Sequence, residues 1–147
     1  LLVLGAGSNL LVPDRGVEGF VLKISIPGIS FEEDAEGVLL IAGAGESWEA
    51  VVEAAAERGL FGIENLAGIP GSVGGAAVQN IGAYGAELSS AFAYADVIQS
   101  VTGEKRRIAR EDAAFGYRDS FFKKHPEWIY KDTPEYNALS GVRDWTP

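Results

Sequence analysis

The 147-residue sequence contains no cysteine and a single histidine, His125. Without cysteine, the chain can form no disulfide bond, no thiolate metal site and no cysteine nucleophile. With only one histidine, zinc sites and histidine-based catalytic triads are unfavourable interpretations. The composition therefore points away from metal chemistry and nucleophilic catalysis built on these residue types.

Long apolar runs and strong basic clusters are also missing. No apolar run approaches the roughly 18 residues that a membrane helix needs, and no signal peptide is visible. The formal net charge is −9, and the only basic cluster is the short run Lys105-Arg106-Arg107. Nucleic-acid binding relies on clustered lysine and arginine. We therefore expect a cytoplasmic protein with neither a nucleic acid nor a membrane as partner.

Methionine is absent as well, and the chain opens directly on the apolar run Leu1-Leu2-Val3-Leu4. Such a run is typical of a buried strand. Because nothing leads into it, we interpret the chain as a fragment whose N-terminal part is missing. The apolar content of 47% is nevertheless that of a globular protein.

Glycine is abundant, with 19 residues, and a first glycine-rich run follows the opening strand. This run is Gly5-Ala6-Gly7-Ser8-Asn9-Leu10. Its backbone N–H groups, with the Ser8 hydroxyl and the Asn9 amide, could cradle a pyrophosphate. The alternative is a tight turn in which these two side chains bond their own backbone. The spacing leaves both interpretations open.

The second glycine-rich run, residues 69–85, reads IPGSVGGAAVQNIGAYG. It predicts a poor helix, since each interior glycine costs about 1 kcal/mol relative to alanine, and a poor strand. It offers bare backbone that a bulky group can approach closely. Gln79 and Asn80 supply amides that could read the edge of a heterocycle. The alternative is close packing of two backbone segments, and Tyr84 is predicted to fill the core.

The clearest helix is predicted over residues 48–58, where Trp48, Val51 and Val52 begin one apolar face. Ser47 is its expected N-cap and Gly59 its end. The remaining elements are predicted as follows: strands at 1–4, 10–12, 19–24, 38–42 and 95–101, a hairpin return at 105–108, a surface turn at 31–37, a short helix at 110–114 and an irregular tail from 125. Short strands with few helices indicate an α+β domain.

Arg118 lies between Tyr117 and Asp119. A guanidinium can hold a carboxylate or phosphate through two hydrogen bonds. From the residues alone, a local ion pair with Asp119 or Glu111 is the favoured interpretation.

Five motifs occur in one order: residues 5–10, 43–45, 62–71, 79–85 and 115–120. This series resembles the family of UDP-N-acetylenolpyruvoylglucosamine reductase, also called UDP-N-acetylmuramate dehydrogenase, of peptidoglycan synthesis. The resemblance covers about residues 1–124. It implies a truncated α+β FAD-binding domain of the vanillyl-alcohol-oxidase (PCMH) type at 1–124, an irregular tail at 125–147 and no substrate-binding domain.

The resemblance also implies the chemistry and the site. NADPH would reduce FAD, and the hydride would then pass to the enolpyruvyl group of a UDP-sugar. Arg118 matches the family's catalytic arginine, which stabilises the developing enolate. The residues that the resemblance assigns to FAD are Gly5, Ala6, Gly7, Ser8, Asn9, Leu10, Ile69, Pro70, Gly71, Ser72, Gly74, Gly75, Asn80, Gly82, Ala83, Tyr84 and Gly85.

Some parts of the family's site find no match in the sequence. The proton-donating serine and a glutamate belong to the substrate-binding domain, and Ser120 lacks the flanking residues of the serine motif. Two alternatives remain: a non-catalytic remnant that binds no flavin, and another flavin oxidoreductase of the same fold. Against the second, such oxidases often tether flavin through His or Cys, and His125 lies outside the motifs.

Overall fold

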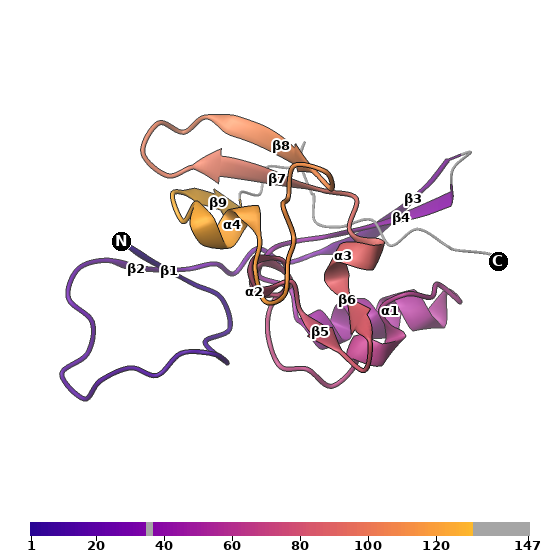
Figure 1. The fold of residues 1–147 in the computed structure, drawn as a ribbon, viewed down its shortest axis with the longest axis horizontal. Helices are drawn as coiled ribbons and strands as arrows, with labels where there is room; N and C mark the ends of the chain where they lie inside the picture. The colour runs from indigo at the N-terminus through magenta and orange to yellow at the C-terminus, as the bar shows by residue number, and fades with distance from the viewer. Residues whose placement is uncertain (35–36, 131–147) are drawn as a thin grey trace.

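The structure is a computed structural model that describes residues 1–34 and 37–130 (Figure 1). Along the chain the elements are β1 (Leu2–Leu4), β2 (Val21–Lys23), β3 (Ile29–Asp34), β4 (Gly37–Ala42), α1 (Trp48–Glu57), the 3₁₀ helix η1 (Glu64–Leu66), α2 (Val73–Gln79), β5 (Gly82–Ala83), β6 (Ala86–Glu87), α3 (Leu88–Ala91), β7 (Tyr94–Gln99), β8 (Lys105–Ala109), α4 (Phe121–Lys124) and β9 (Trp128–Tyr130). Short strands and short helices alternate irregularly, which confirms the α+β prediction.

The strands form four small sheets in the described part of the chain. β1 and β2 pair in parallel, whereas β3–β4 and β5–β6 are antiparallel pairs. The fourth sheet has the order β8-β7-β9 and is antiparallel throughout. Figure 1 shows the helices gathered between these sheets, while β1, β2 and their connecting loop extend away from them.

Helix α1 supplies one wall of the core. Its apolar face, predicted from the sequence, buries Trp48, Val51 and Val52. The Trp48 indole N–H donates to the Leu66 carbonyl at 2.9 Å, which ties α1 to η1. Ser47 stands at the N-cap position but makes no capping hydrogen bond through its side chain. The helix prediction is therefore confirmed, and its cap differs.

Helix α2 lies inside the second glycine-rich run, where no helix was predicted. Two features offset the glycine cost of about 1 kcal/mol per residue. The Ser72 hydroxyl caps the helix by accepting from the Gly75 N–H at 3.4 Å. Val73, Gly74, Ala76 and Ala77 are buried, and the Gly74 N–H donates to the Ala44 carbonyl at 2.9 Å. Tertiary packing therefore outweighs local propensity.

The end of this run forms a β5–β6 hairpin. Tyr84 and Gly85 occupy its two-residue turn with φ values of 52° and 82°, as type I′ turns require. Tyr84 is 90% exposed, so its expected place in the core is wrong. A two-residue hairpin turn holds its central side chains away from the strands' packed face.

Other local predictions differ where tertiary pairing decides. Residues 31–37 were predicted as a turn, yet β3 pairs with β4 and its Phe31 packs against the core. Residues 10–12 form no strand and 110–114 form turns. The tail predicted from residue 125 is not irregular at its start, because β9 pairs with β7. Residues 131–147 lie outside the described residues.

Candidate functional site

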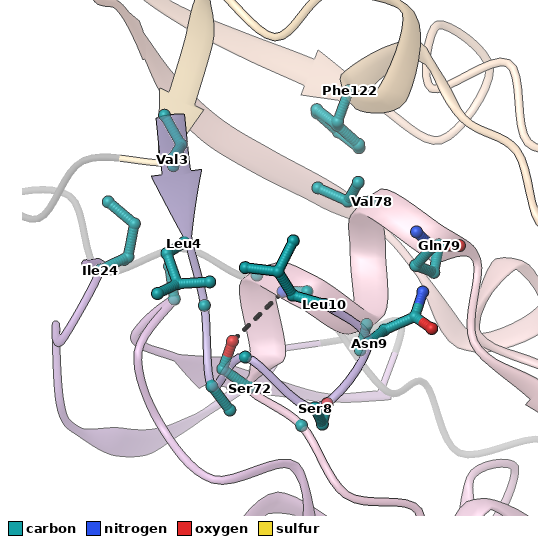
Figure 2. A pocket seen from close by; sticks show the side chains of 18 of the residues that line it. Val3, Leu4, Ser8, Asn9, Leu10, Ile24, Ser72, Val78, Gln79 and Phe122 are labelled. Carbon is teal, nitrogen blue, oxygen red and sulfur yellow. Dashed lines mark hydrogen bonds between the residues drawn. The ribbon is translucent and has the colours of Figure 1, made fainter. Parts of the chain in front are cut away.

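A pocket of about 770 Å³ opens beside β1, the loop that follows it and α2 (Figure 2). Its far wall comes from α4 and the start of β9. Of the residues expected to contact FAD, the pocket is lined by Gly5, Ala6, Gly7, Ser8, Asn9, Leu10, Ile69, Pro70, Gly71, Ser72, Gly74 and Gly75. Arg118 lines it too. Both halves of the expected site therefore meet in one cavity.

The loop of residues 5–10 has backbone N–H groups without acceptors. Within the described residues, no backbone or side-chain oxygen accepts from any of its six N–H groups. Gly7 has a φ of 78°, and residues 6–10 are exposed. Consecutive free N–H groups around a left-handed residue form a concavity that binds anions. The loop is thus equipped for a phosphate-type ligand.

The side chains of this loop do not form the self-bonded turn that was the alternative. The Ser8 hydroxyl donates instead to the Pro70 carbonyl at 3.0 Å. Within the described part of the chain, the Asn9 amide has no protein partner, and Figure 2 shows it near Gln79 at the pocket. Ser8 therefore ties the loop to the second glycine-rich run and leaves its backbone free.

Close approach between the two runs requires glycine at position 5. A Cβ atom at Gly5 would lie 2.6 Å from the Ser72 hydroxyl oxygen. Ser72 is 4% exposed and caps α2, so it has little room to move. Glycine at this position lets the loop pack directly on the start of α2.

The N-terminus of α2 is not a second anion cradle. The N–H groups of Val73 and Gly74 donate to the carbonyls of Glu46 and Ala44 at 3.0 and 2.9 Å, and the Gly75 N–H donates to Ser72. Because these donors already have acceptors, α2 contributes shape to the pocket rather than phosphate-binding N–H groups.

Asn80 does not lie at the pocket. It is 1% exposed and ends α2 in a left-handed conformation with φ 42°. Its amide nitrogen donates to the Glu87 carboxylate and the Gly116 carbonyl, both at 3.0 Å, and its amide oxygen accepts from the Ser89 N–H at 3.0 Å. The Asn80 side-chain amide is therefore bonded within the protein, and the expected contact of Asn80 with the cofactor stays a prediction.

The rest of the hairpin lies outside the pocket lining as well: Gly82, Ala83, Tyr84 and Gly85. Gln79, one residue before Asn80, lines the pocket instead. The two adjacent amide residues therefore have different places: Gln79 lines the cavity, and Asn80 bonds within the core. Gln79 is the last residue of α2, whereas Asn80 follows it in a left-handed conformation, and no helix was predicted here from the sequence.

Arg118 lines the pocket and has a strained backbone conformation. Its φ is 53°, a region that costs a non-glycine residue about 1–3 kcal/mol. It belongs to a tight turn closed by reciprocal backbone bonds between Gly116 and Asp119 at 2.9 and 3.1 Å. Its guanidinium donates to the Gly82 carbonyl at 3.0 Å. Strain at such a position points to a functional constraint.

The ion pair expected between Arg118 and an acidic neighbour does not form. Asp119 pairs with Lys124 at 2.6 Å, and a hydrogen bond from that lysine holds the pKa of Asp119 below its ordinary value. Among the described residues, the Arg118 guanidinium has no carboxylate partner. Its charge is available to a ligand.

Several pocket residues were not singled out from the sequence. Lys123 lines the cavity, and its ammonium donates to the Arg118 carbonyl at 2.7 Å. The apolar lining includes Leu4, Ile24, Val78, Phe122 and Trp128, several of which Figure 2 shows around the loop. Lys123 lies three residues beyond the motif of residues 115–120, so its nearness to Arg118 in the sequence was the only available signal. The apolar residues carry no signal distinguishable from core packing.

The comparisons with known proteins bear on this geometry. A family model described as an FAD binding domain matches residues 1–108. The chain belongs to the FAD-binding domain family. FAD is thus the cofactor of its family, as expected, and the flavin-binding fold class is confirmed.

Within this FAD-binding family, the chain is similar to reductases. It is 47% identical over 131 residues to UDP-N-acetylenolpyruvoylglucosamine reductase of Pseudomonas aeruginosa, covering 88% of this chain and 38% of that protein. The reductase of Shigella boydii is 43% identical over 149 residues, covering 100% of this chain and 42% of that protein. The chain thus spans about two fifths of the length of these relatives.

A solved structure agrees with these relatives. The crystal structure of UDP-N-acetylenolpyruvylglucosamine reductase from Thermus caldophilus matches with a TM-score of 0.69 and 34% identity, over 96% of this chain and 46% of that one. The expected resemblance is confirmed. It also extends beyond residue 124, where it was expected to stop, because the alignment with the Shigella protein covers the whole chain.

Within 1–34 and 37–130, no group of three or more His, Asp or Glu side chains is arranged to hold a metal ion. None of the helices described there is long and apolar enough to cross a membrane.

Proposed function

We propose that this chain is the flavin-binding part of an NADPH-dependent UDP-N-acetylenolpyruvoylglucosamine reductase, which acts in peptidoglycan precursor synthesis in the cytoplasm. The observation that carries the proposal is the loop of residues 5–10, whose six N–H groups lack acceptors among the described residues and line a cavity of about 770 Å³. A dinucleotide brings a pyrophosphate to such a loop and apolar rings to the cavity walls.

The residues present fit FAD. The loop supplies neutral donors for the pyrophosphate, and Arg118 and Lys123 add positive charge at the same cavity. The apolar lining, which includes Leu4, Ile24 and Val78, suits an aromatic ring system. Gln79 and Asn9 supply polar groups that can orient a heterocycle. FAD, when bound, would supply the hydride-transfer chemistry.

Arg118 is the chain's candidate for the catalytic role. The acceptor would be an enolpyruvyl group, and addition of a hydride to it builds negative charge next to a carboxylate. A guanidinium already oriented by the Gly82 carbonyl stabilises such charge without reorganisation, which is worth about 10²–10³ in rate per donor in comparable sites. Arg118 has no carboxylate partner of its own among the described residues, so its charge can act on a ligand.

The first experiment tests flavin binding. The chain is incubated with FAD and desalted, and its absorbance spectrum and melting temperature are recorded. We expect retained flavin bands and a melting temperature that rises with FAD concentration, because a ligand that binds only the folded state stabilises it. If the flavin bands and the melting shift were both absent, the chain would be a non-catalytic remnant of the domain.

The second experiment tests the reaction. The chain replaces the aligned 131 residues of the Pseudomonas aeruginosa reductase, and NADPH oxidation is followed with and without the enolpyruvyl UDP-sugar. We expect oxidation that depends on the sugar, and a fall in turnover of about 10²–10³ for Arg118→Ala. Turnover unaffected by Arg118→Ala would remove the catalytic role from this residue.

A further inference from the structure

Lys123 contacts the backbone of Arg118 rather than a carboxylate. Its ammonium lies 2.7 Å from the Arg118 carbonyl oxygen, the distance of a charge-assisted hydrogen bond. Both side chains line the same pocket. The bond therefore reaches a pocket residue whose guanidinium has no carboxylate partner among the described residues and whose backbone is left-handed, with φ 53°.

The base of Lys123 is firmly anchored. Ser120, which is fully buried, accepts from the Lys123 N–H at 3.2 Å and donates to the Val78 carbonyl at 2.8 Å. Helix α4 packs against α2, and residues of both helices line the pocket. The Lys123 side chain thus extends from a fixed point in the core to the tip of the Arg118 turn.

A second lysine in the same helix provides the contrast. Lys124 bonds the Asp119 carboxylate at 2.6 Å, on the closing residue of the turn, and does not line the pocket. Both bonds are exposed, where ionic contacts add little to stability. Their difference is therefore one of geometry: Lys123 holds the residue that faces the ligand, and Lys124 holds its neighbour.

We propose that Lys123 is a positioning residue for Arg118: by bonding the Arg118 carbonyl it holds the strained turn in the conformation in which the guanidinium bonds the Gly82 carbonyl and Arg118 lines the pocket. The inference rests on the proposed function for its catalytic meaning, but the contact itself can be measured without flavin. A guanidinium held in place before the ligand arrives loses less entropy and needs less rearrangement in the reaction.

The test begins with nuclear magnetic resonance of the flavin-free chain. The Arg118 Nε–H signal is identified by its loss in Arg118→Lys. In Lys123→Met we expect this signal to shift and to broaden through faster exchange with water, while the melting temperature stays near that of the unmodified chain. Lys123→Arg, which keeps a cationic donor, should return the signal to its original position and width. Lys124→Met is the matched control and should leave the position and width unchanged.

The kinetic consequence is measured in the reductase chimera. Lys123→Met should lower kcat about tenfold while the KM for NADPH changes less than twofold, as for lost orientation. Lys124→Met should leave both unchanged. An Arg118 signal that is the same in Lys123→Met as in the unmodified chain overturns the inference. If the chimera oxidises no NADPH even with Lys123 and Lys124 both unchanged, the result counts against the proposed function alone. The Arg118 signal reports the Lys123 contact independently of that activity.

Discussion

Two glycine-rich regions of this chain have similar composition and opposite uses. Residues 5–10 leave six backbone N–H groups without acceptors among the described residues and expose five of their six positions. Residues 69–85 bond the N–H groups at the start of α2 to Glu46, Ala44 and Ser72 and bury much of their length. In the first region glycine opens the backbone to a ligand, and in the second it lets helices pack closely.

The comparison teaches that glycine content alone does not locate an anion site. What matters is whether the exposed backbone donors already have partners. Residues 69–85 contain more glycine than residues 5–10, and two amides, Gln79 and Asn80. In the structure the donors are free in the shorter run, and the longer run shapes the wall beside it.

The largest effect on stability should come from Asn80, which belongs to the glycine-rich run whose polar groups are bonded within the protein. Asn80→Ala removes three hydrogen bonds at a residue that is 1% exposed and leaves the Ser89 N–H and the Gly116 carbonyl without that partner. We expect the free energy of unfolding to fall by about 3 kcal/mol, measured by urea denaturation. Gln79→Ala, the adjacent control, should stay within about 0.5 kcal/mol.

The same two variants test whether Gln79 serves the pocket while Asn80 serves the core. Flavin titrations of the folded proteins should show weakened FAD binding for Gln79→Ala, since Gln79 lines the pocket. If Asn80→Ala weakened FAD binding at unchanged stability, the buried role given to Asn80 would be wrong.

Two glycines with similar backbone angles make the next comparison. Gly7 and Gly85 have φ values of 78° and 82°, and a Cβ at either meets nothing closer than 3.9 Å. Alanine at either position should therefore cost a similar 1–2 kcal/mol of stability. Only Gly7→Ala should also weaken FAD binding, by about tenfold or 1.4 kcal/mol, because only Gly7 lies in the loop with free N–H groups.

Isothermal titration with FAD distinguishes the two glycine variants, and thermal denaturation checks that their stability losses match. An FAD affinity that stays unchanged in both Gly7→Ala and Gly85→Ala would mean that the loop does not hold the cofactor. Equal loss of affinity in both would implicate the hairpin that lies outside the pocket.

The part of the fold that could be predicted is the part with strong local periodicity. The apolar face of α1, beginning at Trp48 and Val51, is buried as its spacing predicted. The strands predicted at 95–101 and 105–108 correspond to the hairpin of β7 (Tyr94–Gln99) and β8 (Lys105–Ala109). The order of five motifs predicted the family. In each case the pattern lies within a short stretch of sequence.

The remainder depends on partners distant in sequence. Helix α2 forms despite its glycines because it packs against residues around Ala44, some thirty positions earlier. Strand β9 forms because Trp128 pairs with Gln99. Asn80 is buried by bonds to Gly116 and Glu87. No local signal distinguishes these residues from loop residues, so only the assembled structure could assign them.

A smaller effect should come from the serine that links the two regions. Ser72 caps α2 and contacts the Gly5 position, whereas Ser47 occupies the N-cap of α1 without a side-chain hydrogen bond. Ser72→Ala should lower the free energy of unfolding by about 1 kcal/mol, and Ser47→Ala by less than about 0.5 kcal/mol, both by chemical denaturation. Similar losses for the two serines would mean that the α2 cap contributes nothing specific.

The smallest effect concerns the turn that joins both regions, since Arg118 lines the pocket of the first and bonds Gly82 of the second. The Lys124 hydrogen bond lowers the pKa of Asp119 in the folded chain. The pair therefore stabilises the fold above the unfolded pKa of this carboxyl, and the contribution is lost as pH falls through its folded pKa. Lys124→Met should raise the pKa of Asp119, read from its carboxyl carbon resonance in an acid titration. Near neutral pH, where Asp119 is ionised in both proteins, FAD affinity should be unchanged, and a change there would show that the turn reaches the cofactor through Asp119 as well as through Arg118.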